Sequence, residues 1–234
     1  MDGGGAVTAD RDGHVYVFYH GGRGTGEDGR RVLLRVSDDS GKTFGQEKIV
    51  SPDGLGVCAC CSMQAFADPT GRLFVIYRAA SDGGRNRDVM VLFSANHGGT
   101  WNSSVVSRWP VAACPMSSMS ISNVGNQTWM TWEKEGQIFI GAWDDKTKAV
   151  SGITPMPGQA SGRKHPVIAA DSDAAHVLIA WTEGTGWNRG GSIGWQMMSA
   201  DLHPSGETGH APGVDVWSLV SAISIPGGGF EILH

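Results

Sequence analysis

An eight-residue pattern, S-x-[DN]-x-G-x-T-[WF], occurs twice and constrains the fold of this chain more than any other feature. Residues 37–44 read S-D-D-S-G-K-T-F, and residues 94–101 read S-A-N-H-G-G-T-W. Asp39 and Asn96 are short polar side chains of the kind that accept backbone N–H bonds within a turn. The glycine two positions later supplies a positive φ, and the final aromatic ring can anchor the turn on a sheet. The pattern therefore predicts two equivalent hairpin turns in a repeated β structure.

Strand-like segments recur between turn signals along the chain, and helical periodicity is almost absent. The expected strands cover residues 15–19, 32–36, 73–77, 89–93, 127–132, 137–143, 177–181 and 192–198. Many short strands at regular spacing are typical of a β-sandwich or a β-propeller. Because part of the sequence repeats, we predict an all-β propeller of four-stranded antiparallel blades.

The repeat predicts about five blades in a single domain that spans residues 1–234. The expected boundaries are 5–51, 63–108, 117–155 and 165–216, followed by a partial blade at 217–234. A partial blade leaves an open edge whose backbone groups lack partners, and such an edge favours association with a second copy. We therefore expect a homo-oligomer or closure of the ring by strand pairing.

Charge and hydropathy exclude two classes of partner. The chain has 234 residues, a net charge of −5 and a pI near 5.9. It therefore lacks the excess of basic residues that is typical of nucleic-acid binding. No apolar run reaches the roughly 18 residues that a membrane helix requires. The opening M-D-G-G-G lacks the features of a signal peptide, and we expect Met1 to be a boundary rather than the natural start.

Residues whose side chains can take part in catalysis or binding gather at one predicted end of the blades. The octapeptide turns would join the third and fourth strands. In an antiparallel blade, the segment entering the first strand and the loop between the second and third strands lie at the opposite end. Functional loops on a rigid scaffold are commonly found together in this way. The candidate site residues below all belong to this second set of segments.

The first group of candidates suits carbohydrate chemistry. Glu133 and Glu183 come from corresponding positions of neighbouring blades, and glycoside hydrolysis requires two carboxylates. Tyr77 is a candidate nucleophile, since sialidases use a tyrosine. Guanidinium groups bind sugar carboxylates, and indole rings stack on sugars. The candidates for substrate binding are Arg78, Arg87, Arg163, Arg189, Trp187 and Trp217. The alternative is that these are surface arginines, structural glutamates and core tryptophans.

The second group of candidates is rich in sulfur. All four cysteines precede a predicted first strand, with Cys58, Cys60 and Cys61 in V-C-A-C-C-S-M and Cys114 in A-C-P-M. His165 occupies the equivalent position one blade later. Soft ligands of this kind suit copper(I) or zinc. Disulfides, for example between Cys114 and Cys60 or Cys61, explain the same spacing, and a catalytic thiolate is a third option. These alternatives stay open at the sequence level. The histidines in turns, among them His14, His97 and His210, are expected to face solvent.

The octapeptides resemble the Asp-box, or BNR repeat, of sialidase-like β-propellers. The stretches V-C-A-C-C-S-M, A-C-P-M-S-S-M, G-R-K-H-P and A-W-T-E-G-T-G-W-N-R-G-G-S resemble a bacterial exo-α-sialidase-like subgroup. The resemblance implies a glycan hydrolase or glycan-binding propeller for an acidic sugar, an extracytoplasmic location, and further blades before Asp2 in a six-bladed ring. The F-R-I-P or Y-R-I-P segment of true sialidases is absent from this chain. A copper or zinc protein and a non-catalytic interaction scaffold are the alternative functions.

Overall fold

The computed structural model describes residues 4–22, 26–159, 162–171, 176–186 and 188–234. The described part is almost entirely β structure, with two short 3-10 helices, η1 (Glu27–Gly29) and η2 (Ala59–Cys61). Within it, no helix is long and apolar enough to cross a membrane. The chain divides into two compact units, Met1–Met116 and Ser117–His234. Each unit is described by itself below.

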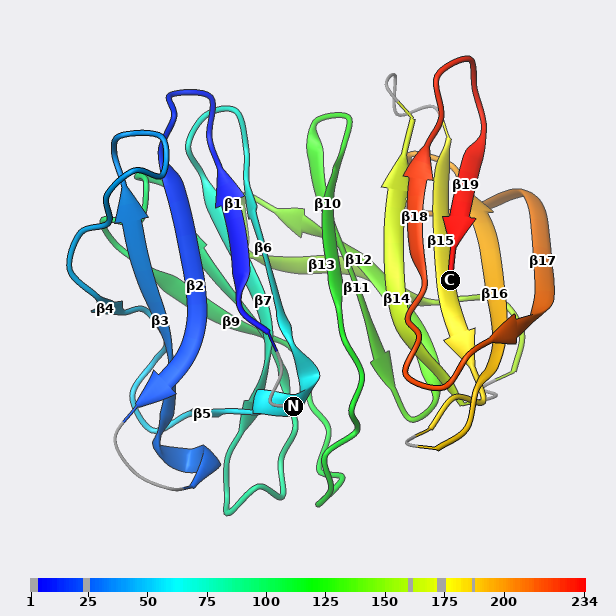
Figure 1. The fold of residues 1–234 in the computed structure, drawn as a ribbon, viewed down its shortest axis with the longest axis horizontal. Coiled ribbons are helices and arrows are strands. Elements are labelled where there is room, and N and C mark those ends of the chain that lie inside the picture. Colours follow the sequence, from blue (N-terminus) through cyan, green and yellow to red (C-terminus); the bar gives the residue numbers. More distant parts are fainter. Residues whose placement is uncertain (1–3, 23–25, 160–161, 172–175, 187) are drawn as a thin grey trace. The chain divides into compact units, whose positions relative to one another are not determined.

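The first unit contains two antiparallel sheets whose strands follow chain order (Figure 1). The strands of the first sheet are β1 (Ala6–Ala9), β2 (Val15–Gly22), β3 (Arg30–Ser37) and β4 (Lys48–Ile49). Those of the second sheet are β6 (Met63–Ala67), β7 (Leu73–Ala80), β8 (Val89–Ser94) and β9 (Asn102–Ser107). A short strand that the sequence did not predict, β5 (Gly56–Val57), pairs with the last residues of β7 beyond the end of β6.

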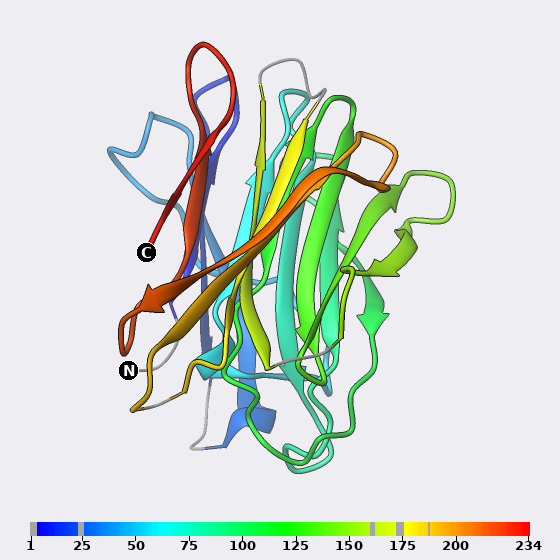
Figure 2. The ribbon, with the colours of Figure 1, turned by 90° about the vertical axis from the view of Figure 1, so that its right-hand side faces the viewer.

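The second unit contains two four-stranded antiparallel sheets and a two-stranded one. The strands of its first sheet are β10 (Ser120–Val124), β11 (Gln127–Lys134), β12 (Gln137–Asp144) and β13 (Ala149–Pro155). Those of its second sheet are β14 (Arg163–Ala170), β15 (Val177–Glu183), β16 (Gly191–Met198) and β17 (Pro204–Val214). The last pair is β18 (Ser221–Ser224) and β19 (Phe230–Leu233). Figure 2 shows the twist of the second sheet, in which β17 (orange) runs obliquely to β15 (yellow).

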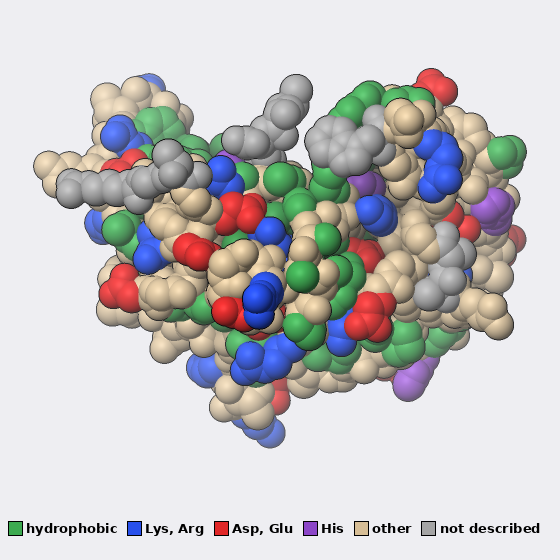
Figure 3. Space-filling model, turned by 90° about the horizontal axis from the view of Figure 1, so that it is seen from below, with side chains coloured by type: hydrophobic (Ala, Val, Ile, Leu, Met, Phe, Trp, Pro, Cys, Tyr) green, Lys and Arg blue, Asp and Glu red, His purple; other side chains and the backbone are tan. Residues whose placement is uncertain are grey.

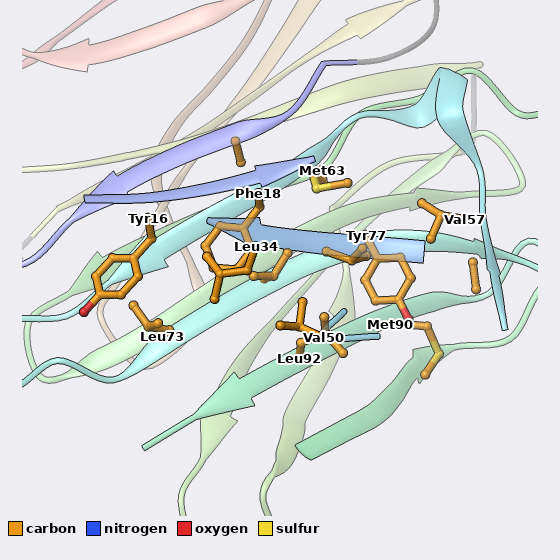
Figure 4. Packing of buried hydrophobic residues seen from close by; sticks show 14 of the residues in the cluster. Tyr16, Phe18, Leu34, Val50, Val57, Met63, Leu73, Tyr77, Met90 and Leu92 are labelled. Atoms are coloured by element: carbon orange, nitrogen blue, oxygen red, sulfur yellow. The ribbon is translucent and has the colours of Figure 1, made fainter. Parts of the chain in front are cut away.

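The middle strands of the second sheet, β7 and β8, are apolar because they are covered on both faces. Every residue of β7 and β8 is buried, and a strand buried on both sides is expected to be a nearly continuous apolar run. In the first unit, side chains from both sheets pack into one core, which includes Tyr16, Phe18 and Leu34 of the first sheet and Leu73 of the second (Figure 4). This core holds the two sheets face to face.

The two octapeptide turns have the predicted geometry. In the first turn, Thr43 N–H donates to Asp39 Oδ1 at 2.8 Å and Gly41 N–H donates to Ser37 Oγ at 2.9 Å. The second turn repeats both bonds at its equivalent residues, each at 2.9 Å. Gly41 and Gly98 have φ values of 83° and 81°. The turns join β3 to β4 and β8 to β9, which confirms their predicted place between third and fourth strands.

In each unit, the chain enters the first strands at the end of the sheets opposite the turns between first and second strands. We call this end the entry end of that unit. In the first unit it is formed by η1, η2 and residues 81–88 and 108–116 (Figure 1). In the second unit it is formed by residues 134–136, 156–163, 184–190 and 215–220, of which 160, 161 and 187 lie outside the described residues. The candidate residues of both groups lie in or next to these segments.

Candidate functional site

Three thiols meet at the entry end of the first unit. Cys58 Sγ lies 3.4 Å from Cys61 Sγ and 3.6 Å from Cys114 Sγ, and Cys61 Sγ lies 3.8 Å from Cys114 Sγ. The thiol of Cys60 belongs to the same site, because its sulfur lies within 4.8 Å of those of Cys58 and Cys114. None of the four cysteines is in a disulfide in this structure. The structure thus brings the two cysteine-containing segments together.

The thiol site is partly buried, and a buried arginine belongs to the same end of the unit. Hydrogen bonds with Cys114 and Cys61, together with burial, raise the pKa of the Cys58 thiol. Arg87 is buried next to the site, and its Nη1 lies 2.7 Å from Glu27 Oε2. Burial alone would lower the pKa of Arg87, but the contact with Glu27 raises it. The guanidinium of Arg87 is thus held by protein groups.

Tyr77 and Arg78 are fully buried within β7. Tyr77 belongs to the core of the first unit (Figure 4), and burial raises the pKa of its hydroxyl. The hydroxyl oxygen has no hydrogen-bond partner among the described residues. Arg78 Nη1 donates to the carbonyl of Arg87 at 2.9 Å, and its guanidinium lies over the ring of Trp109. The structure therefore places both candidates beneath the surface.

A carboxylate site lies at the entry end of the second unit, where Arg163 and Glu183 are directly paired across β14 and β15. Arg163 Nε donates to Glu183 Oε1 at 3.0 Å. Trp181 lies two residues before Glu183, on the same face of the strand, and its indole N–H donates to the same oxygen at 2.8 Å. Guanidinium and indole groups can only donate hydrogen bonds, so Glu183 accepts in both contacts.

Further contacts hold Arg163 in place. Its Nη1 donates to Gln137 Oε1 at 2.9 Å and to the carbonyl of Pro157 at 2.7 Å. Its guanidinium also lies 4.8 Å from the centre of the Trp181 ring, which is within the range of a cation–π interaction. Arg163 therefore positions Glu183 and has its own donors largely occupied by protein acceptors.

A glycine on the neighbouring strand makes room for this arrangement, because it has no side chain. Gly194 lies opposite Trp181 in β16. A Cβ at this position would come 2.5 Å from the Trp181 indole nitrogen and 3.0 Å from Glu183 Oε1. On the neighbouring strand, His210 lies opposite Gly194, with Nδ1 3.4 Å from Glu183 Oε2. Glu183 thus has one oxygen held by Arg163 and Trp181 and one oxygen facing an exposed histidine.

Glu133 has a different environment, although its sequence position corresponds to that of Glu183. It is 1 % exposed. Its Oε1 accepts the backbone N–H of Gly136 at 2.8 Å, and the carbonyl of Gly136 accepts the N–H of Arg163 at 3.0 Å. Glu133 therefore supports the turn between β11 and β12 and, through that turn, the backbone of Arg163.

Arg189 and Trp217 are the exposed candidates among the described residues of this end. Arg189 Nε donates to the carbonyl of Gly184 at 2.8 Å, next to Glu183 in the chain. Trp217 is 67 % exposed. It lies two residues after Asp215. The backbone of Asp215 is so near Gly190 that a Cβ on Gly190 would contact it. The loop that carries Arg189 thus borders the segment that carries Trp217. Trp187 lies outside the described residues.

His165 lies in the second unit and is held by its neighbours. Its Nδ1 accepts the backbone N–H of Ser118 at 3.2 Å and lies 3.1 Å from Ser118 Oγ. Because a backbone N–H can only donate, the ring proton of the neutral form is on Nε2. Burial and the nearby charge of Lys164 lower the pKa of His165 to about 4, so the ring is neutral near pH 7.

The entry ends share a backbone feature that sequence reasoning missed. Ser62, Met116, His165 and Trp217 have φ values of 51°, 49°, 53° and 66°. Each lies at or within a few residues of the start of a first strand, β6, β10, β14 or β18. A non-glycine residue with positive φ costs conformational energy, and such residues concentrate at functional sites. No residue type in these four positions signals the shared conformation.

Other contacts were also beyond the sequence. The role of Trp181 could have been found from strand alternation, because it lies two residues before Glu183. Gln137 and Pro157 carry no sequence signal of their contact with Arg163. His14 and His97 were expected to face solvent, yet both contact Asp10 Oδ2, at 2.7 Å and 3.2 Å. Tyr16 donates to the same oxygen at 2.9 Å, and together these hydrogen bonds outweigh burial and lower the pKa of Asp10 to about 2.

Figure 3 shows Lys and Arg side chains next to Asp and Glu side chains. The surface in this view therefore presents both charges rather than one. This agrees with the ion pairs of Arg87 with Glu27 and of Arg163 with Glu183.

Comparison by sequence finds no relative: no family model matches the chain, and no curated protein matches it.

Comparison by structure finds propeller enzymes. The GH93 α-L-arabinofuranosidase of Fusarium graminearum has a TM-score of 0.67 and 12% identity, with 98% of this chain and 73% of that chain covered. The α-L-arabinanase of Penicillium chrysogenum has a TM-score of 0.62 and 12% identity, over 98% and 74%. The intramolecular trans-sialidase of Ruminococcus gnavus has a TM-score of 0.56 and 16% identity, over 87% and 45%. At these identities the likeness concerns the fold, and this chain has the all-β fold of propeller glycoside hydrolases.

Proposed function

We propose that this protein is a glycoside hydrolase whose substrate meets the entry end of the second unit. The observation that carries the proposal is the carboxylate of Glu183, held by Arg163 and Trp181 with one oxygen left toward His210. The shared fold adds support, because the similar structures named above are glycan-active enzymes. Fold likeness alone does not establish an activity, so the site carries the argument.

In this proposal, Glu183 is the carboxylate that reacts. A glycosidase needs one carboxylate that attacks the anomeric carbon or takes a proton from water, and one acid that protonates the leaving oxygen. Glu183 accepts hydrogen bonds from Arg163 and Trp181 and is partly accessible, with a side chain 16% exposed. It therefore suits the first of these roles. Arg163 and Trp181 position the carboxylate.

The other two catalytic candidates receive different roles. Glu133 and Tyr77 are buried, whereas a catalytic residue must touch substrate. We propose that Glu133 maintains the β11–β12 turn beneath Arg163, and that Tyr77 is part of the core of the first unit. His210 is 55% exposed and 3.4 Å from Glu183, which makes it the described group best placed to exchange a proton with substrate next to Glu183.

Substrate contacts are proposed for Arg189 and Trp217. An exposed indole offers a flat apolar face to a sugar ring, and Trp217 is exposed. Recognition of an acidic sugar requires a guanidinium that is free to pair with its carboxylate. Arg78, Arg87 and Arg163 are buried, whereas Arg189 is exposed, so Arg189 is the arginine that we propose for this contact. The expected extracytoplasmic location remains a prediction.

The test is hydrolysis by the purified protein of a neutral substrate, arabinobiose, and of an aryl α-sialoside. Glu183→Gln should reduce turnover at least about 100-fold, since a reacting carboxylate supplies several kcal/mol to the transition state. Glu207→Gln, an exposed carboxylate on β17 of the same unit, is the matched control and should leave turnover unchanged. Circular dichroism and thermal melting of both variants check that the fold is retained.

The outcomes separate the alternatives. Full turnover by Glu183→Gln would remove Glu183 from the reaction. Sialoside turnover that falls in Arg189→Gln, with arabinobiose unaffected, would support the acidic sugar. If the protein neither hydrolyses nor binds either glycan, the proposal is contradicted. An absence of hydrolysis and binding would favour the non-catalytic scaffold.

A further inference from the structure

We propose that Cys58, Cys60, Cys61 and Cys114 form a thiolate site for a d10 metal ion, Zn²⁺ or Cu⁺, at the entry end of the first unit. The proposal is independent of the glycosidase proposal, which concerns residues of the second unit. It rests on the positions of the four sulfurs and on the backbone hydrogen bonds of the segments that carry them.

The sulfur separations fit a shared ion. A tetrahedral site with Zn–S bonds of about 2.3 Å places its sulfurs roughly 3.8 Å apart. The three closest pairs here are separated by 3.4, 3.6 and 3.8 Å. A disulfide requires about 2.05 Å, so none of these pairs is bonded. Cys60 is the fourth ligand, because its sulfur lies within 4.8 Å of those of Cys58 and Cys114.

The backbone holds the ligands in place before any ion binds. The N–H of Cys58 donates to the carbonyl of Arg78 at 2.9 Å, immediately after β5. Cys60 and Cys61 lie in η2, whose short helical turn brings both toward Cys58. The N–H of Ala112 donates to the carbonyl of Arg85 at 2.8 Å, which fixes the loop that delivers Cys114. Little backbone rearrangement is therefore needed for coordination.

Binding of an ion to four thiols needs no redox partner. Coordination displaces a proton from each thiol to solvent and transfers no electron. Cys58 and Cys61 are buried, whereas Cys60 and Cys114 are partly exposed. Ions can therefore enter from the side of Cys60 and Cys114.

Such a site would be structural. With four protein ligands, no position is left open for substrate, and a closed thiolate site contributes its binding energy to folding. The ion would join η2, which leads into β6, to the loop that follows β9. The sequence left two explanations of this contact open, a disulfide and a metal site.

The first test uses the full chain, purified with reductant, stripped of metal and titrated with Co²⁺ as a spectroscopic probe for Zn²⁺. We expect about one equivalent to bind and to give the near-ultraviolet thiolate-to-cobalt charge-transfer bands and the intense visible bands of a tetrahedral site. Addition of Zn²⁺ should abolish the bands. Zn²⁺ should also raise the thermal midpoint of the apo protein, because an ion that binds only the native state stabilises it.

Variants assign the ligands. Cys114→Ser should lower the affinity for Zn²⁺ by more than the roughly 10–100-fold typical of losing an outer-shell partner. Cys60→Ser should lower this affinity less. Ala113→Ser is the matched control, since it adds a hydroxyl on the exposed neighbour of Cys114, and it should bind as the wild type does. The titration of the wild type stands even if a variant fails to fold.

Competition with a Zn²⁺ chelator and, separately, with a Cu⁺ chelator shows which ion the site holds more tightly. Mass spectrometry of protein purified without reductant reports disulfides directly. The proposal is overturned if Co²⁺, Zn²⁺ and Cu⁺ all fail to bind the reduced protein, which would leave four packed thiols. It is also overturned if Cys114→Ser binds as well as the control does, or if the native protein contains two disulfides.

Discussion

Replacing Arg163 by methionine should destabilise the second unit and couple strongly to the replacement of Glu183 by glutamine. Methionine keeps much of the apolar stem of arginine but has no charge and no N–H group. Arg163→Met therefore removes the ion pair with Glu183, the bonds to Gln137 and Pro157, and the cation–π contact with Trp181. In this variant Glu183 still accepts the hydrogen bond from the Trp181 indole N–H and still lies near His210.

The burial of the pair sets the magnitude. The side chains of Arg163 and Glu183 are 10% and 16% exposed. Exposed pairs contribute about 0.2–1 kcal/mol, whereas removing one partner of a buried pair costs about 3–5 kcal/mol. Since this pair is nearly buried and Arg163 makes further bonds, Arg163→Met should cost about 3 kcal/mol. Glu183→Gln keeps an oxygen acceptor for Trp181 and should cost about 1–2 kcal/mol.

The assay is urea unfolding of the wild type, both single variants and the double variant, followed by fluorescence and circular dichroism. Because the two side chains are in contact, the double variant should lose less stability than the sum of the single losses, with a coupling of about 1–2 kcal/mol. A loss below about 1 kcal/mol in Arg163→Met, or additive losses within error, would refute the view that this pair organises the site.

Three further predictions concern pH and packing. The pKa of His165 falls from 6.5 to about 4 on folding, so the unfolded chain binds a proton that the native state does not, and acidification from pH 6.5 to 4 should cost up to about 3 kcal/mol; His165→Gln should flatten urea unfolding across this window. The pKa of Asp10 falls from 3.8 to about 2, so its contribution of about 2 kcal/mol is present above pH 3.8 and is lost as pH falls toward 2; Asp10→Asn should remove this acid-limb dependence. Gly194→Ala places a Cβ 2.5 Å from the Trp181 indole nitrogen and should cost about 1–3 kcal/mol through overpacking. Gly186→Ala has no atom within 4 Å and should be neutral in the same thermal melt.

Much of the fold could be read from local sequence patterns. The eight predicted strands appear as β2, β3, β7, β8, β11, β12, β15 and β16, each of them extended by one to three residues. Apolar runs bounded by glycine and aspartate turns are local signals, and so is the chemistry of the octapeptide turns. The strand β5 was missed, because its two residues are too few to show periodicity. They pair with β7 only where β7 extends beyond the end of β6.

The candidate site could be predicted only in part. Composition and spacing pointed to the four cysteines, to Glu183 and to Arg163, because these residue types carry recognisable chemistry. Their environments could not be predicted. Glu133 and Glu183 occupy corresponding sequence positions, yet one is buried under a turn and the other pairs with an arginine across a strand.

The sequence by itself determined the strands, the turns and the end of the sheets at which the candidate residues lie, since these follow from the order of apolar, polar and glycine residues along a short stretch. Only the tertiary structure decided which groups pair. It brought Cys114 to within 3.6 Å of Cys58, buried Tyr77 and Arg78, and set Arg163 against Glu183. Contacts between distant segments depend on sheet register and on packing of neighbouring sheets, and neither is encoded in any one local pattern.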